Sequence, residues 1–269
     1  MALWKWEAKV QPKAVIVLVH SAYEHHLRYA WLIEQWRTAG YHVIMGDLPG
    51  HGRGVPGGQP HHEPFDEFEE SVKLGIVVAQ ENDLPIFIAA HGLGATIAMN
   101  VLSKKAYPIA GAIFTSPWLH LLKTPSKLSS ALSGLHQLTA AMKIDHGIKI
   151  GDLTRNPDVI ESEKNDPFYR TQITVGWYHE LQTYMRKTAL GKGKFPDIPV
   201  LLHTGERDRI ADKEYAKRWL KGQELKDFSY KEWSGCSHDL FQEPEREDIL
   251  AATDFFIRSS LRTLGYVVN

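Results

Sequence analysis

Polar residues stand at the ends of four apolar runs in this sequence: His20-Ser21, the turn at Gly92, Asp208 and His238. The last three follow one another in the order sharp turn, carboxylate, histidine. Acyl transfer needs such a set, because a histidine must take a proton from a weak nucleophile while a carboxylate holds the imidazole in the required tautomer. The crest of the turn is where a nucleophile would stand, yet Gly92 has no side chain to present.

The stretch Ile86–Thr96, IFIAAHGLGAT, has the pattern of a strand that turns sharply into a helix. An apolar run ends at a small residue, glycines follow, and helical spacing resumes. The pattern predicts a strand over 86–90 and a helix over about 95–103, with residue 92 at the crest between them. His91 ends the strand, where a packed or hydrogen-bonded role is more common than a chemical one.

The rest of the chain supplies elements that would carry these strand ends to one edge of a sheet. Short β-branched or apolar runs predict strands, and apolar residues at helical spacing predict helices between them. This alternation favours a mostly parallel sheet covered by helices on both faces, with ligands at the carboxyl edge of the strands. We expect strands within 14–20, 41–54, 109–117, 198–208 and 229–238, and helices over 29–39, 66–81 and about 245–264.

Residues 119–194 interrupt this alternation. The region is helical and amphipathic in pattern and contains no convincing strand. We therefore expect a helical cap, inserted before the acid-bearing strand, that lies over the carboxyl edge of the sheet. The predicted α/β architecture has one core, residues 1–118 and 195–269, and one cap, residues 119–194. Apolar cap residues would pack on the core or line an acyl tunnel: Leu128, Leu132, Leu135 and Leu138.

Taken in order, these segments resemble the α/β-hydrolase superfamily, and within it the bacterial lysophospholipases and monoacylglycerol lipases, often grouped as serine aminopeptidase S33-like hydrolases. The similarity covers nearly the whole chain. VLVHSAYEHHLRYAWLIEQWRTAGYHVIMGDLPGHGRG is similar to the family's His-Gly loop, its Glu-His…Arg-Tyr segment and its Asp-x-x-Gly-His-Gly turn. AAHGLGATIAM resembles its nucleophile elbow, LLHTGERDRIAD its acid loop, and GCSHDLFQEPERED its histidine loop. Each motif alone is weak, but four in order at strand ends are specific.

The resemblance implies an α/β-hydrolase fold and hydrolysis of a carboxylic ester, such as a monoacyl lipid or a lysophospholipid, through an acyl-serine. It assigns His238 as the base and Asp208 as the acid that orients it. It also assigns the backbone N–H groups of Ala22 and Leu93 as the oxyanion hole. We expect no cofactor and no metal. The supporting positions suggested are His20, Ser21 and His91.

Two residues depart from the family pattern. Gly92 stands where the family has the nucleophilic serine, and Ser21 stands where it usually has glycine. Loss of the nucleophile lowers turnover of a well-studied serine protease by about 10⁶, so we expect the chain as it stands to be inactive or strongly impaired. Glycine also relieves the backbone strain of such a turn. A naturally silent site and a deliberate substitution would look the same in this one sequence.

Two classes of function stay open. One is an ester hydrolase with a changed nucleophile, and the other is a non-catalytic protein that holds an acyl-like or small apolar ligand in the capped pocket. Lyase or cofactor-free chemistry on the same fold is a third. Ser21 is the best substitute nucleophile, although a loop residue whose hydroxyl caps a backbone group is the more common case. Cys236, two residues before His238, is another, although a lone buried thiol is usually inert.

Bulk composition narrows the partners and the compartment. The 269 residues are 43% hydrophobic with a formal net charge of −1, which gives no reason to expect nucleic acid as a partner. The single cysteine excludes an internal disulfide, and the first residues lack the apolar core of a secretion signal, so we expect a cytoplasmic protein. Peripheral membrane contact through the cap stays open. His25-His26 and His61-His62 lack carboxylate or thiolate partners at ligand spacing, which disfavours a metal site.

Overall fold

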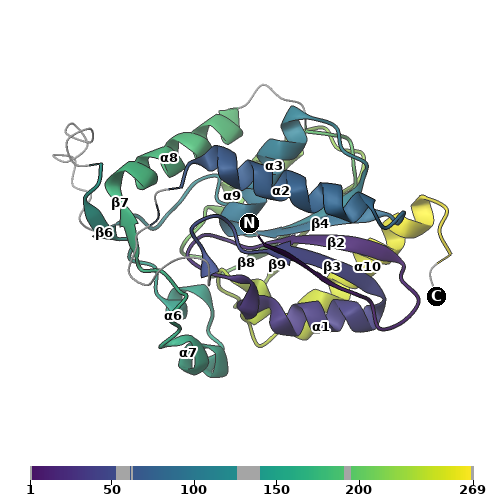
Figure 1. The fold of residues 1–269 in the computed structure, drawn as a ribbon, viewed down its shortest axis with the longest axis horizontal. Coiled ribbons are helices and arrows are strands. Elements are labelled where there is room, and N and C mark those ends of the chain that lie inside the picture. Colours follow the sequence, from purple (N-terminus) through teal and green to yellow (C-terminus); the bar gives the residue numbers. More distant parts are fainter. Residues whose placement is uncertain (1, 53–60, 62, 126–139, 191–194, 268–269) are drawn as a thin grey trace.

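The computed structural model describes residues 2–52, 61, 63–125, 140–190 and 195–267. Its centre is a seven-stranded sheet in the order β1-β3-β2-β4-β5-β8-β9 (Figure 1). All neighbouring strands are parallel except β1, which runs antiparallel to β3. The strands are β1 (Leu3–Trp6), β2 (Ala14–Val19), β3 (Tyr41–Gly46), β4 (Ile86–His91), β5 (Ile109–Thr115), β8 (Val200–Gly205) and β9 (Phe228–Trp233).

Helices cover both faces of the sheet because its central strands are apolar on both sides. Every residue of β2 and of β4 is buried, and successive side chains point to opposite faces. In β2, Val15 and Val17 join the core on one face, whereas Ile16 joins the core on the other. One face carries α2 (Phe65–Gln80), α3 (Gly92–Lys104), α8 (Val175–Leu190) and α9 (Lys213–Lys221), and the other carries α1 (Ala30–Ala39) and α10 (Arg246–Thr263).

The predicted mostly parallel α/β sheet is confirmed, and each predicted strand and helix of the core is present with its ends moved by a few residues. The helix after β4 begins at Gly92 rather than near residue 95, so the turn residue is itself the first residue of α3. Among the described elements that were not predicted are β1 and α9. The edge strand β1 has only four residues, and α9 buries only Ala216 and Leu220, so neither has a strong apolar pattern.

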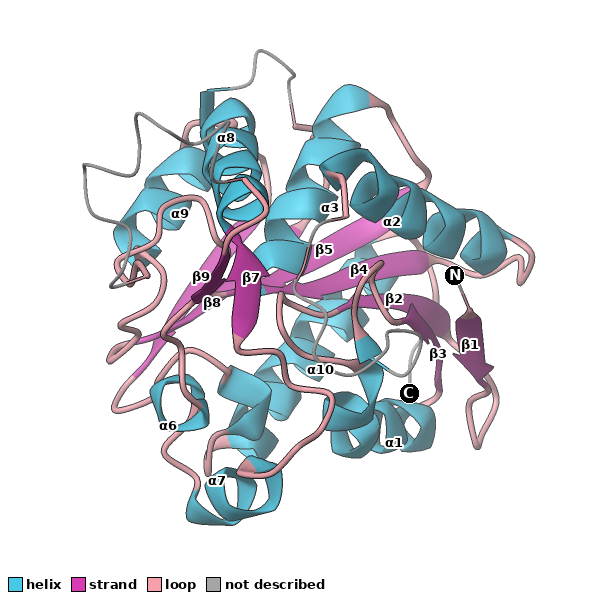
Figure 2. Cartoon of the chain, turned by 60° about the vertical axis from the view of Figure 1, so that its left-hand side comes forward, coloured by secondary structure: helices cyan, strands magenta, loops and turns pink. Residues whose placement is uncertain are grey.

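Part of the region between β5 and β8 lies at the carboxyl ends of the strands, where α6 (Ile150–Leu153), α7 (Pro157–Glu163) and β7 come forward of the sheet (Figure 2), whereas α8 packs against α2 and α3. The expectation of no strand in this region is wrong, because β6 (Lys143–Asp145) pairs antiparallel with β7 (Gln172–Thr174). Strands of three residues are too short to show an alternating pattern. The leucines considered for an acyl tunnel, residues 128, 132, 135 and 138, lie outside the described residues.

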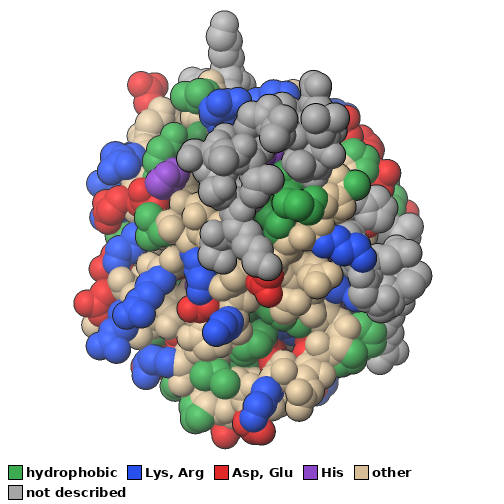
Figure 3. All heavy atoms as spheres, turned by 90° about the vertical axis from the view of Figure 1, so that its left-hand side faces the viewer, with side chains coloured by type: hydrophobic (Ala, Val, Ile, Leu, Met, Phe, Trp, Pro, Cys, Tyr) green, Lys and Arg blue, Asp and Glu red, His purple; other side chains and the backbone are tan. Residues whose placement is uncertain are grey.

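Basic and acidic side chains are interspersed with hydrophobic ones on the end of the molecule that carries β6, β7 and α7 (Figure 3). Leu122 and Met142, from the region between β5 and β8, are exposed hydrophobic residues. Among the helices that the structure describes, none has both the length and the apolar character needed to cross a bilayer.

Candidate active site

The turn after β4 has the geometry of a nucleophile elbow without a nucleophile. β4 ends at His91, and α3 begins at Gly92, whose φ of +52° lies in the left-handed region that favours glycine. A Cβ on Gly94 would lie 2.2 Å from the carbonyl oxygen of His20. The elbow therefore packs directly against the loop after β2, and its crest carries only backbone.

The structure brings Asp208 and His238 together from two loops. Asp208 follows β8 and His238 follows β9, and His238 Nδ1 lies 2.7 Å from Asp208 Oδ2. The other carboxylate oxygen, Oδ1, accepts hydrogen bonds from the backbone N–H groups of Ile210 and Ala211 over 2.8 and 3.1 Å. Asp208 is thus held by its own loop and presents one oxygen to the imidazole, which carries its proton on Nδ1.

Burial and charge act in opposite directions on this pair. Burial by itself would raise the pKa of Asp208 and lower that of His238. Their mutual attraction and hydrogen bond, together with the neighbouring groups, outweigh burial, so the pKa of Asp208 is lowered and the pKa of His238 is raised. The backbone bonds from Ile210 and Ala211 lower the pKa of Asp208 further. A carboxylate that favours the imidazolium in this way suits a general base.

The Nε2 atom of His238, the nitrogen that would take a proton from a nucleophile, already has a hydrogen-bond partner. The indole Nε1–H of Trp118 donates to it over 3.0 Å. Trp118 is only 1% exposed, and its backbone N–H donates to the carbonyl oxygen of Gly92 over 3.1 Å. An indole therefore stands between the base and the elbow.

Ser21 fills the space next to Gly92. A Cβ on residue 92 would lie 2.1 Å from Ser21 Oγ and 2.7 Å from Ser21 Cβ. Ser21 Oγ also accepts a hydrogen bond from the backbone N–H of Leu93 over 3.0 Å. The amide predicted for the oxyanion hole is therefore already used by a side-chain hydroxyl.

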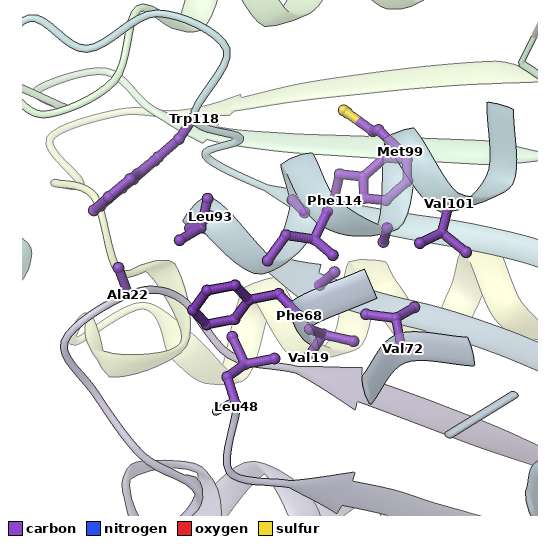
Figure 4. Close-up of a cluster of buried hydrophobic side chains, with 14 of the residues drawn as sticks. Val19, Ala22, Leu48, Phe68, Val72, Leu93, Met99, Val101, Phe114 and Trp118 are labelled. Atoms are coloured by element: carbon purple, nitrogen blue, oxygen red, sulfur yellow. The ribbon is translucent and has the colours of Figure 1, made fainter. Parts of the chain in front are cut away.

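The cavity at this point has a volume of about 10 Å³, which is room for about one water molecule. Its lining includes Ser21, Ala22, Trp118 and His238. Figure 4 shows that Ala22, Leu93 and Trp118 converge from the loop after β2, from α3 and from the loop after β5. The described side chains leave no room for an acyl chain between the base and the elbow in this state.

A buried arginine ties three segments together around the site. Arg28, 7% exposed, contacts Glu24, Asp239 and Glu163. Its Nη2 lies 3.0 Å from Asp239 Oδ2, and its Nε donates to Glu163 Oε1 over 2.9 Å. Glu24 lies in the loop after β2, Asp239 adjoins the histidine, and Glu163 ends α7. One side chain thus fixes the loop after β2, the loop that carries His238 and a helix of the 119–194 region relative to one another.

Glu24 holds the loop that carries Ser21 through hydrogen bonds. Its Oε1 accepts from the backbone N–H of Ser21 over 2.6 Å and from the hydroxyl of Tyr29 over 2.7 Å. Burial opposes its ionisation, but the charge of Arg28, together with His91, His20 and the hydrogen bond from Tyr29, lowers the pKa of Glu24 to about 2. Glu24 is therefore a carboxylate at neutral pH, and it holds the backbone of Ser21 in place.

His20 and His91 are hydrogen-bonded supports. Nδ1 of His20 lies 2.6 Å from the carbonyl oxygen of Ser21, and its Nε2 accepts from a backbone N–H of the loop after β3 over 2.8 Å. Nδ1 of His91 lies 2.9 Å from Thr115 Oγ1, and its ring centre lies 4.8 Å from that of His238. Burial lowers the pKa of both histidines, so both rings are neutral at pH 7.

Cys236 is not placed as a nucleophile. Its buried thiol donates to Glu245 Oε2 over 3.5 Å. Burial, together with the negative charges of Glu245 and Glu243, raises the pKa of Cys236 to about 12. The thiol stays protonated at neutral pH, which disfavours nucleophilic attack by Cys236.

Sequence reasoning missed two residues that bond to His238: Trp118, which donates to its ring, and Ser116, which donates to its backbone. Ser116 has a φ of +46°, and its Oγ donates to the carbonyl oxygen of His238 over 2.8 Å. The available signal was the polar pair Thr115-Ser116 at the end of β5, a fifth polar strand end like the four already singled out. Its spacing alone does not tell which side chain reaches His238.

Comparisons with known proteins show the family and the fold. The family model described as Serine aminopeptidase, S33 matches residues 10–245. Phospholipase YtpA of Bacillus subtilis (strain 168) is 38% identical over 256 residues, which cover 94% of this chain and 98% of that protein. The crystal structure of Paleococcus ferrophilus monoacylglycerol lipase has a TM-score of 0.82 at 27% identity, covering 97% of this chain and all of that one. A monoglyceride lipase from Saccharomyces cerevisiae, at 17% identity and a TM-score of 0.81, has the same fold.

The chain therefore belongs to the Serine aminopeptidase, S33 family of α/β-hydrolases, as the motifs had indicated. Within that family it is similar to proteins named as a phospholipase and as monoacylglycerol lipases.

Proposed function

We propose that this chain carries the site of a carboxylic ester hydrolase for monoacyl lipids or lysophospholipids, with its acid–base half kept and its nucleophile lost. The observation that carries the proposal is the 2.7 Å contact between His238 Nδ1 and Asp208 Oδ2 beside an elbow whose crest is Gly92. The names of the relatives, a phospholipase and monoacylglycerol lipases, support the substrate class.

In this proposal each retained group has one role. His238 Nε2 takes the proton of an attacking hydroxyl, and Asp208 stabilises the imidazolium that results. The backbone N–H groups of Ala22 and Leu93 bind the oxyanion. Because Gly92 has no hydroxyl, no acyl-enzyme forms at the elbow, and we expect a loss of turnover on the scale of about 10⁶ known for removal of a serine nucleophile.

A non-catalytic ligand-binding protein is the second candidate. It is favoured by the bonds from Trp118 to His238 Nε2 and from Leu93 to Ser21 Oγ, because both groups that would act on an ester are satisfied within the protein. The departures from the family pattern at both Ser21 and Gly92 also fit this candidate, because a single deliberate inactivation would change only one position. The cavity of about 10 Å³ implies that a ligand must displace side chains to enter.

We further propose that residues 1–118 and 195–269 act as the core and residues 119–194 as a cap that contacts a lipid surface, in a cytoplasmic protein. The exposed Leu122 and Met142 of the cap support the contact with a lipid surface. The thiol of Cys236, which forms no disulfide, supports the cytoplasmic compartment. Co-sedimentation of the protein with vesicles of phosphatidylcholine and monoacylglycerol would test the surface contact. The variant Leu122→Asp is expected to sediment with the vesicles less than the unmodified protein does.

The double variant Ser21→Gly/Gly92→Ser tests the proposed hydrolase site. Both changes are needed, because Ser21 occupies the place of a side chain on residue 92. We expect it to hydrolyse p-nitrophenyl butyrate and monoacylglycerol at least about 10³-fold faster than the unmodified protein. Adding His238→Ala should abolish the gain. A folded double variant without His238-dependent hydrolysis of any ester would contradict the proposal.

A further inference from the structure

We propose that Ser21 and Trp118 together replace the missing nucleophile as hydrogen-bond partners, so that the residues at positions 21, 92 and 118 jointly close the site. Ser21 takes the amide of the oxyanion hole, and Trp118 takes the nitrogen of the base. This inference rests on the proposed function, because it treats Leu93 and His238 as the oxyanion donor and the base. For convenience the three residues are called the closing unit.

The first half of the closing unit is the exchange between positions 21 and 92. Ser21 Oγ lies 2.1 Å from the point that a Cβ of residue 92 would occupy, so the two side chains exclude each other. With Gly92, that space accepts the hydroxyl of Ser21. The space beside the crest therefore holds a single side chain, and it comes from Ser21 in the loop after β2 and not from residue 92.

The hydroxyl of Ser21 is bound at the head of a helix. Leu93 is the second residue of α3, and the first N–H groups of a helix have no partner within the helix. Its N–H donates to Ser21 Oγ over 3.0 Å. Ser21 itself is 3% exposed and held by its neighbours, because Glu24 accepts its backbone N–H and Nδ1 of His20 lies 2.6 Å from its carbonyl oxygen. The hydroxyl is fixed in the oxyanion hole.

The second half of the closing unit is the indole of Trp118. Its Nε1 lies 3.0 Å from His238 Nε2 and 3.1 Å from the point that a Cβ on Gly92 would occupy. It therefore occupies the line between elbow and base that a nucleophile's hydroxyl would use. The ring is held by burial and by packing against Tyr23, with ring centres 5.7 Å apart.

The two halves account for the state of both catalytic groups. A base whose Nε2 lone pair accepts from an indole cannot at the same time accept the proton of Ser21, and an amide that binds Ser21 Oγ does not bind a carbonyl oxygen. Ser21 is therefore a plug and not a displaced nucleophile. Restoring activity requires the serine to return to the elbow and the plug to leave.

Four proteins test the closing unit: the unmodified chain, Gly92→Ser, Ser21→Gly, and the double variant. Each is treated with a fluorophosphonate, which forms a bond from a serine oxygen to phosphorus while fluoride leaves and the hydroxyl proton passes to His238. We expect labelling at residue 92 of the double variant. Gly92→Ser alone should label about 10²-fold more slowly, because its hydroxyl is displaced by Ser21. Trp118→Phe in the double background should accelerate labelling.

Two labelling results would overturn the inference. Equal rates for Gly92→Ser and the double variant would mean that Ser21 does not block the elbow. Labelling of Ser21 in the unmodified chain would make Ser21 a nucleophile. If none of the four proteins is labelled, the proposed hydrolase function fails, and the closing unit is then decided by a measurement that needs no chemistry.

That measurement is hydrogen exchange by NMR of the Leu93 amide and the Trp118 indole N–H. We expect Ser21→Ala to accelerate exchange at Leu93 and to leave Trp118 unchanged, and His238→Ala to accelerate exchange at Trp118. Unchanged rates at both protons in both variants would overturn the closing unit even if the hydrolase proposal holds.

Discussion

Replacing Gly92 by alanine measures how tightly Ser21 fills the elbow. The new Cβ would lie 2.1 Å from Ser21 Oγ, and the φ of residue 92 is +52°. A left-handed backbone costs a residue with a Cβ about 1–2 kcal/mol, and relieving an overpacked contact costs about 1–3 kcal/mol more. We therefore expect Gly92→Ala to lower the free energy of unfolding by about 2–5 kcal/mol.

Two further variants separate backbone strain from the clash. Gly147 has a φ of +78° with nothing within 4 Å of an added Cβ, so Gly147→Ala reports the strain alone, about 1–2 kcal/mol. Prior Ser21→Gly removes the clash with the Ser21 side chain and leaves only the contact with Trp118 Nε1 at 3.1 Å. Gly92→Ala should therefore cost less in the Ser21→Gly background than in the unmodified chain. Urea unfolding gives the free energies of this cycle. If the effects of Ser21→Gly and Gly92→Ala on the free energy of unfolding add within about 0.5 kcal/mol in the double variant, the reasoning is refuted. Additivity would show that Ser21 does not occupy the space of a Cβ on residue 92.

The buried charges give two other expected outcomes. Asp208→Asn should cost most stability between pH 3.8 and 6.5, since the lowered pKa of Asp208 stabilises the fold above 3.8 and is lost as the pH falls through its folded value. The raised pKa of His238 stabilises the fold below pH 6.5, and this stabilisation is lost as the pH rises through the folded pKa. A difference in the free energy of urea unfolding between the unmodified chain and Asp208→Asn that does not change with pH would contradict the pair. Arg28→Met leaves three carboxylates without their cation and should cost about 3–5 kcal/mol in urea unfolding. Lys226→Met, which removes an exposed ion pair, should leave the midpoint unchanged, and equal effects of the two substitutions would argue against the arginine network.

The fold could be predicted because its signals are local and strong. The fully buried β2 and β4 are continuous apolar runs, which is how strands covered on both faces read in a sequence. Parallel topology then sends their carboxyl ends to one edge, so Asp208 and His238, each just after a strand, could be expected near each other. The elbow could be located because its strand, glycines and helix are contiguous in the chain.

The contacts that define the state of the site could not be predicted in the same way. Trp118 meets His238 across 120 residues of sequence and Leu93 meets Ser21 across 72, and no periodicity encodes such a meeting of loops. The sequence showed that Ser21 and Gly92 both depart from the family pattern. That the two departures occupy a single volume depends on the distance between two loops, which only the packed structure supplies. The strands β6 and β7 were missed because three residues do not make a period.

The ion pairs of Arg28 with Glu24, Asp239 and Glu163 restrict how the site can open. One guanidinium forms ion pairs with carboxylates from the loop after β2, from the histidine loop and from α7. If one of these segments moved away by itself, a buried charge would lose its partner, which is costly. We therefore expect these three segments to open together, with amides that share a common free energy of opening in hydrogen exchange. Solvent would then reach this part of the site only when all three segments move at once.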